Sequence, residues 1–238
     1  MSGGFARIGE WAEFKMVNAS GTLGFTAENV LVEGRMYTDP DAIRAIVNIQ
    51  KGDPLFALNP AEAKDMLEKL SWVKSAEVQR RLPDTLYIEL EERQPLALWQ
   101  RNKRVSLIDR EGKILTEQKL KRFKDLVIVT GKAAETEAEN LIKHLNAEPT
   151  IRARTEAAAF ISERRWDVKL KDGKTIRLPE DDIGFALHRL AKLDEEEGIL
   201  DRAILSIDLR QRDRISVQTS PNSVENYKAS YTKKDGAI

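Results

Sequence analysis

Residues 79–99 read Gln-Arg-Arg-Leu-Pro-Asp-Thr-Leu-Tyr-Ile-Glu-Leu-Glu-Glu-Arg-Gln-Pro-Leu-Ala-Leu-Trp, and this stretch decides the fold. Apolar and polar residues alternate over 86–90 and again over 76–80, which predicts two strands that each bury one face. The turn between them is Leu82-Pro-Asp-Thr85, in which proline presets φ and Asp bonds its own backbone. Pro95 removes a donor and ends the second strand. A new apolar run follows at once, so one domain closes here and another begins with almost no linker. The residues predicted on the polar face are Tyr87, Glu89 and Glu91.

Residues 24–94 follow a β-α-α-β-β pattern. Val30 and Val32 lie in a short first strand. Two helices then begin with cap chemistry next to a proline. The first cap is a hydroxyl or a carboxylate in Thr38-Asp39-Pro40, and the second lies at Asn59-Pro60. Two helices on a three-stranded sheet make a compact domain of roughly 70 residues. The predicted buried residues are Ile43, Ile46 and Val47 in the first helix, and Ala63, Met66, Leu67 and Leu70 in the second.

Residues 95–220 are rich in strands, and the whole chain is predicted to be α+β. The segment 166–178 is a second hairpin, with a turn at Lys171-Asp-Gly173. Pro179-Glu-Asp-Asp182 caps a long helix. Other predicted strands are 96–99, 105–108, 126–129, 157–161, 204–209 and 215–219, and helices are predicted at 135–145 and 183–193.

The two ends of the chain differ from the middle. Residues 1–23 place Phe5, Ile8 and Trp11 at helical spacing, which fits either a frayed terminal helix or a juxtamembrane segment at a membrane interface. Residues 221–238 are polar, and we expect them to form a disordered tail.

Composition excludes several classes of function. The chain has 39 basic and 39 acidic residues, and this zero net charge removes the usual electrostatic reason to expect a nucleic-acid ligand. It has no cysteine, which excludes disulfides, thiolate catalysis and cysteine zinc sites. No run approaches the roughly 18 apolar residues of a membrane helix.

We expect no catalytic, metal or cofactor site. The only histidines, His144 and His188, lie in predicted helices without a second histidine one turn away. No glycine-rich phosphate loop and no nucleophile elbow occurs. The acidic pairs Glu91-Glu92 and Asp181-Asp182 resemble a glycosidase pair only superficially. The first ends an exposed strand, and the second is placed in the first turn of a helix, where acids favour the helix dipole.

One ordered set of stretches runs along the chain: 24–35, 72–83, 92–99, 165–173, 178–180 and 207–210. Together they resemble the FtsQ/DivIB family of cell-division proteins, most closely its alphaproteobacterial members. The similarity runs from about Gly24 to Thr219. It implies an N-terminal POTRA domain, a C-terminal β domain of the family type, and no enzymatic activity.

The resemblance also implies a location and partners. Such a protein has one transmembrane helix in the inner membrane, here expected just before residue 1, with this region in the periplasm at the division septum. It joins FtsB and FtsL to septal peptidoglycan synthesis as part of the divisome. In the family, the partner pairs with the last strand of the β domain, here 215–219. Strand addition satisfies the unpaired N–H and C=O groups of an edge strand.

The partner-binding residues predicted on this basis are Gln211, Asp213, Arg214, Ile215, Val217 and Thr219. Gln211 and Thr219 stand where enterobacterial relatives carry an aromatic residue and a tryptophan, so the aromatic anchors are not retained. Arg212–Arg214 either replace those anchors or protect the exposed edge from aggregation. Tyr227 and Tyr231 are further candidates for the replacement.

Two other functions compete with this interpretation. One is the POTRA-containing periplasmic part of an outer-membrane assembly or secretion protein, which requires a long series of alternating strands after repeated POTRA units. The other is a peptidoglycan-acting enzyme, for which the sequence offers no catalytic group.

Overall fold

The computed structural model describes residues 25–219. They form two compact units that divide between Arg93 and Gln94, and each unit is described here by itself. The predictions for 1–23 and 221–238 lie outside the described residues.

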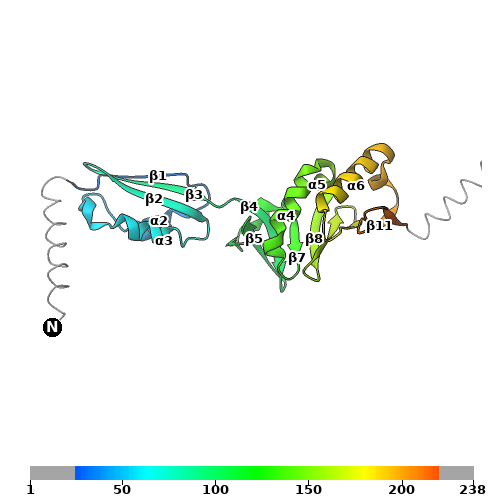
Figure 1. The fold of residues 1–238 in the computed structure, drawn as a ribbon. Coiled ribbons are helices and arrows are strands. Elements are labelled where there is room, and N and C mark those ends of the chain that lie inside the picture. The colour runs from blue at the N-terminus through cyan, green and yellow to red at the C-terminus, as the bar shows by residue number, and fades with distance from the viewer. Residues whose placement is uncertain (1–24, 220–238) are drawn as a thin grey trace, which may run out of the picture. The chain divides into compact units, whose positions relative to one another are not determined.

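The first unit has the predicted β-α-α-β-β order (Figure 1). Strand β3 lies between β1 and β2, parallel to β1 and antiparallel to β2. Asp39 and Asn59 cap the two helices, each accepting a hydrogen bond from a backbone N–H of the first turn. The elements are β1 (Asn29–Glu33), α2 (Pro40–Val47), η1 (Leu55–Ala57), α3 (Pro60–Leu67), β2 (Val73–Arg81) and β3 (Thr85–Glu92).

The core of this unit confirms most of the predicted pattern and corrects three residues. Tyr87, predicted on the polar face, is buried because the guanidinium of Arg81 lies 3.3 Å from its ring centre. Glu92 does not end an exposed strand: it is 8% exposed and bonded to backbone N–H groups. Met66 is 47% exposed, since α3 turns that side to solvent.

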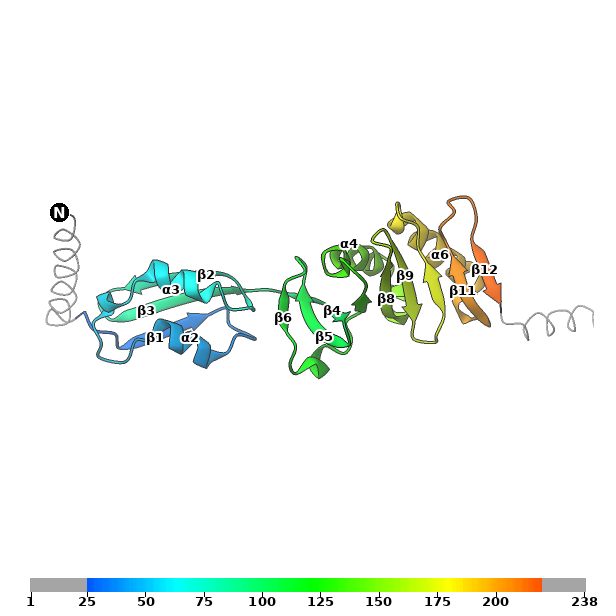
Figure 2. The same cartoon turned by 90° about the horizontal axis from the view of Figure 1, so that it is seen from below.

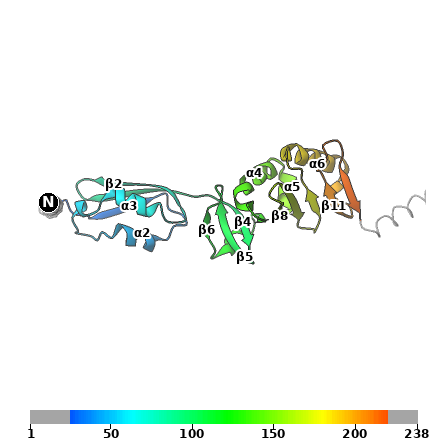
Figure 3. The same ribbon diagram turned by 60° about the horizontal axis from the view of Figure 1, so that its bottom comes forward.

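The second unit is a nine-stranded mixed sheet with the order β12-β11-β10-β9-β8-β7-β4-β5-β6. Helices α4, α5 and α6 lie along one face of it (Figure 3). The elements are β4 (Pro95–Arg101), β5 (Arg104–Asp109), β6 (Ile114–Thr116), η2 (Leu120–Phe123), β7 (Ile128–Thr130), α4 (Ala134–Ala147), α5 (Pro149–Arg154), β8 (Thr155–Ile161), β9 (Arg165–Leu170), β10 (Thr175–Arg177), α6 (Ile183–Glu197), η3 (Ile199–Asp201), β11 (Ile204–Asp208) and β12 (Ser216–Thr219).

The start of α6 differs from the prediction. Asp182 is the residue before the first turn, in a left-handed conformation, and its side chain makes no capping hydrogen bond. The first turn itself contains no acid. Asp182 instead forms an ion pair with Arg212, 3.6 Å away, so this carboxylate serves the contact between α6 and the loop that follows β11.

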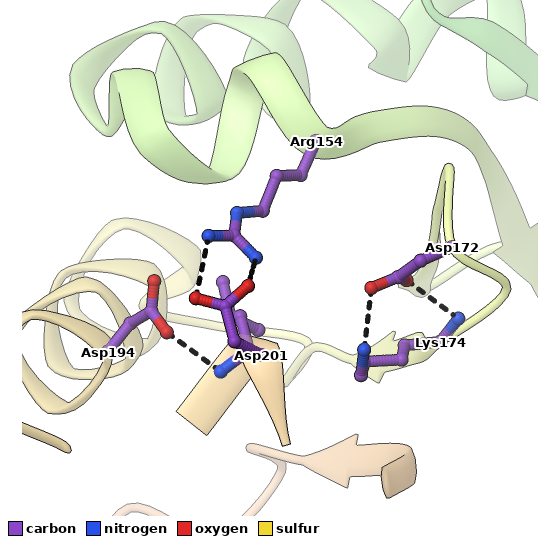
Figure 4. A network of polar contacts seen from close by, with 6 residues as sticks. Arg154, Asp172, Lys174, Asp194 and Asp201 are labelled. Carbon is purple, nitrogen blue, oxygen red and sulfur yellow. Dashed lines mark hydrogen bonds and ion pairs between the residues drawn. The ribbon is translucent and has the colours of Figure 1, made fainter. Parts of the chain in front are cut away.

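The other end of α6 is held by a network of polar contacts (Figure 4). Arg154, at the end of α5, binds the carboxylate of Asp201 at 2.6 and 3.3 Å. This hydrogen-bonded ion pair lowers the pKa of Asp201 and raises that of Arg154. Asp194 accepts the backbone N–H of Leu200 at 2.7 Å. The turn from α6 into β11 is therefore fixed, which in turn places β11 and β12.

Candidate partner-binding edge

Strand β12 is the outermost strand at one end of the second sheet (Figure 2). It pairs antiparallel with β11, and the register places Ser216 opposite Asp208, Val217 opposite Ile207 and Gln218 opposite Ser206. A bulge lies nearer the start of β11, between Ile204 and Ser206, and does not interrupt these three pairs.

The hydrogen bonds of β11 reveal which backbone groups of β12 point outward. The N–H of Leu209 donates to the carbonyl of Arg177, at the end of β10, at 2.9 Å. Backbone groups alternate along a strand, so Asp208 and Ser206 point toward β12. Ser216 and Gln218 therefore bond to β11, whereas the N–H and C=O of Val217 point away from the sheet. A strand added at this edge would form its hydrogen bonds with the N–H and C=O of Val217.

The structure places the predicted partner-binding residues in two groups. Val217, 38% exposed, and Thr219 lie on β12 itself. Gln211, Asp213 and Arg214 lie exposed in the loop before it, where Arg214 is 3.8 Å from the carboxylate of Asp213. Tyr227 and Tyr231 fall outside the described residues. Ile215 differs from the other predicted partner-binding residues, because it is half-buried. Its side chain packs against the core of this unit and anchors the loop.

The triplet Asp208-Leu209-Arg210 fixes the beginning of that loop. The carboxylate of Asp208 accepts hydrogen bonds from Nε of Arg210 at 2.9 Å and from Nη2 at 2.6 Å. These bonds lower the pKa of Asp208 and raise that of Arg210. Leu209 between them is buried. Arg210 is thus occupied within the chain and holds the strand end in shape.

Sequence reasoning missed one part of this region, the exposed aromatic ring of Phe185 on α6. Phe185 is 47% exposed, and the guanidinium groups of Arg189 and Arg212 lie 5.7 and 5.4 Å from the centre of its ring. Arg189 also donates a hydrogen bond to the backbone carbonyl of Arg212. The available signal was that position 185 lies off the buried stripe of the helix. Arg212 therefore folds back onto α6.

A shallow pocket of about 290 Å³ lies beside this cluster. Both Arg189 and Arg212 line it, together with Phe185 and the buried Leu209. An apolar ring with two flanking cations can receive an apolar or acidic side chain of a neighbouring chain. The pocket is lined in part by the loop that connects β11 to β12.

Neither a metal site nor a membrane span is found in the described part of the chain. Within residues 25–219, no group of three or more His, Asp or Glu side chains is arranged to hold a metal ion. None of the helices in that range has the length and apolar character needed to cross a bilayer.

Comparison with known proteins matches both units to one family. Residues 25–93 match the POTRA domain, FtsQ-type, and residues 97–210 match the C-terminal domain of cell division protein FtsQ/DivIB. The chain is 38% identical over 217 residues to cell division protein FtsQ of Bradyrhizobium diazoefficiens, covering 90% of this chain and 64% of the relative. It is 34% identical to the FtsQ of Rickettsia felis, covering 90% of this chain and 80% of that relative. The FtsQ of Caulobacter vibrioides is 36% identical, with 84% and 67% covered.

Proposed function

Because the chain belongs to the FtsQ/DivIB family of cell-division proteins, we propose that it is a non-enzymatic scaffold of the bacterial division complex. Family membership supports the role in cell division. The scaffold role is our inference, and the edge strands β1 and β12 of the two sheets support it.

The proposed mechanism is strand addition at β12. An extended segment of FtsB pairs with the outer side of β12, where Val217 offers both an N–H and a C=O. The outward direction of Val217 is the observation that carries this proposal. Main-chain hydrogen bonds then supply affinity, and side chains around the edge supply specificity.

We propose that the loop preceding β12 determines which partner binds. Gln211, Asp213 and Arg214 are exposed in the loop that precedes β12. The guanidinium group of Arg212, in the same loop, lies 5.4 Å from the ring centre of Phe185. This arrangement favours a segment that carries an acidic or an apolar residue just outside its pairing strand.

The proposal includes a location in the cell. A single transmembrane helix preceding this region would place it in the periplasm, anchored in the inner membrane and gathered at the septum. The chain spans 64% of the length of the Bradyrhizobium relative.

The two competing functions are addressed by different observations. The second unit matches the FtsQ/DivIB C-terminal domain, which favours the division protein over a part of an outer-membrane assembly or secretion protein. A peptidoglycan-acting enzyme is addressed by incubating the chain with cell-wall polymer, and we expect no soluble fragments.

Replacement of Val217 with proline tests the mechanism. Val217→Pro removes an outward donor while leaving the bonds of Ser216 and Gln218 to β11 in place. We expect it to abolish FtsB binding in a calorimetric titration. Val217→Thr keeps the N–H and the β-branched shape, and should bind within about threefold of the original chain. Equal binding by both variants would contradict strand addition.

A further inference from the structure

Strand β1 is a second exposed edge, and it lies in the first unit. It pairs only with β3 among the described residues, so its other side is open. All five of its residues are exposed, including Val30 at 44%, Leu31 at 48% and Val32 at 36%. An open edge with apolar side chains on both faces is an unusual feature, because native proteins usually protect such edges with charges or proline.

The backbone direction along β1 follows from its start. The carbonyl of Asp84 accepts the N–H of Asn29 at 3.3 Å, as well as that of Glu28 just before the strand. Asn29 is in register with Thr85 of β3, so this bond belongs to the parallel ladder. Alternation then directs Leu31 toward β3 and leaves the N–H and C=O groups of Val30 and Val32 pointing outward.

We propose that β1 pairs antiparallel with β1 of a second copy of this chain, about a two-fold axis at Leu31. The strand reads Asn29-Val-Leu-Val-Glu33. Two valines flank a central leucine, one end residue is an uncharged asparagine, and the other is a glutamate. In the symmetric register, Val30 faces Val32 of the other copy and Asn29 faces Glu33. No two like charges lie opposite each other, as antiparallel pairing requires.

This register satisfies the outward backbone groups. Val30 and Val32 exchange N–H and C=O bonds with their counterparts, and the two Leu31 residues form the non-hydrogen-bonded pair between them. A second copy fits this edge because the strand is complementary to itself, so that one pairing serves both molecules.

The same pairing brings apolar side chains of the two copies together on both faces of the sheet. Val30 and Val32 are in register with the buried Leu86 and Ile88, so they extend the core face of the sheet. Leu31 is in register with Tyr87 and lies on the other face. Gly34, at φ +75°, ends the strand and limits the contact to five residues. Such a small interface makes a weak dimer.

The absence of cysteine from the chain permits a direct test by disulfide trapping. In the 238-residue chain, Leu31→Cys brings two thiols together at a pair whose Cα atoms are about 4.5 Å apart, within disulfide range. Val30→Cys is the matched control, because the two Cα atoms at position 30 would be about 8 Å apart, beyond bridging distance. Under mild oxidation we expect Leu31→Cys to form covalent dimer at least about tenfold faster than Val30→Cys. Equal rates would overturn the proposal.

A second measurement does not depend on oxidation. Sedimentation equilibrium of the original chain should show concentration-dependent dimer, and Leu31→Lys should remove it, because two lysines would face each other across the axis. Met36→Lys adds the same charge at a residue that is 72% exposed but outside β1, and should leave the dimer intact. Self-association that survives Leu31→Lys, or an original chain that stays monomeric, would refute the inference. Neither variant touches β12, so FtsB binding is a separate readout.

Discussion

The carboxylate of Glu92, at the end of β3, accepts a hydrogen bond from the backbone N–H of Thr38 at 2.7 Å. The N–H of Tyr37 adds bonds of 2.8 and 3.0 Å to the same carboxylate. Tyr37 also stacks on Trp72, with ring centres 4.5 Å apart. One buried acid therefore joins the end of the hairpin to the segment that leads into α2.

Replacing Glu92 with glutamine should destabilise the first unit by about 1–3 kcal/mol, because an amide cannot accept three N–H bonds as a carboxylate does. Urea unfolding followed through NMR signals of residues 25–93 measures this change. Glu91→Gln is the matched control, since Glu91 is exposed and pairs only with side chains, Lys74 and Ser75. A Glu92→Gln chain as stable as Glu91→Gln would show that the bonds contribute nothing.

The same carboxyl group predicts a pH dependence. Burial raises the pKa of Glu92, but hydrogen bonds from Thr38 and from backbone N–H groups outweigh it, and the net pKa lies below the ordinary value of 4.5. Its contribution to stability is therefore complete above about pH 4.5 and is lost as the pH falls through the lowered pKa.

Urea midpoints at a series of pH values check this sign. The difference in stability between the original chain and Glu92→Gln should be largest near neutral pH and should shrink in acid. A difference that grows in acid would mean that the folded pKa is raised.

Two glycines offer a comparison of backbone effects in the second unit. A Cβ at Gly112 would lie 2.7 Å from the backbone carbonyl oxygen of Glu135, and φ is +77°. At Gly173 φ is +90° and nothing lies within 4 Å. Gly173→Ala should cost about 1–2 kcal/mol through φ alone, and Gly112→Ala clearly more, because backbone cannot move aside easily. Thermal unfolding of both variants measures the difference, and equal losses would argue against close packing at Gly112.

The contact between α6 and the loop before β12 is predicted to support partner binding. Arg189→Ala removes the hydrogen bond to the carbonyl of Arg212 and one cation beside Phe185. Binding of FtsB must then order a loop that this bond no longer holds, so the lost bond of about 0.5–1.5 kcal/mol weakens FtsB binding by at most about 2- to 12-fold. Lys192→Ala, on an exposed position of the same helix, should bind as the original chain does. Calorimetric titration compares them, and an unchanged Arg189→Ala affinity would exclude this contribution.

Much of the fold can be predicted from local chemistry. The hairpin around Pro83 follows from alternation and a turn, and the helices after Asp39 and Asn59 follow from their caps. These signals lie within a few residues of one another. The short elements α5 and β6 carry no comparable local pattern and were not predicted.

The contacts that escape prediction join distant parts of the chain. Glu92 is buried because it meets Thr38, 54 residues away in sequence. The hydroxyl of Tyr87 donates a hydrogen bond to the carboxylate of Glu33, which is also 54 residues away. At the candidate edge, alternation predicts the last strand, but the outward direction of Val217 depends on Leu209 bonding to β10. These contacts can be deduced only when the order of the strands in the sheet is known.

Amide hydrogen exchange of β12 tests the central claim most directly, because it reports on single backbone N–H groups. In the free chain, the N–H of Val217 should exchange quickly while those of Ser216 and Gln218 are protected by β11. On addition of the FtsB segment, the account predicts that Val217 becomes strongly protected and that its neighbours change little. A Val217 amide that still exchanges quickly in the saturated complex would contradict strand addition at this edge.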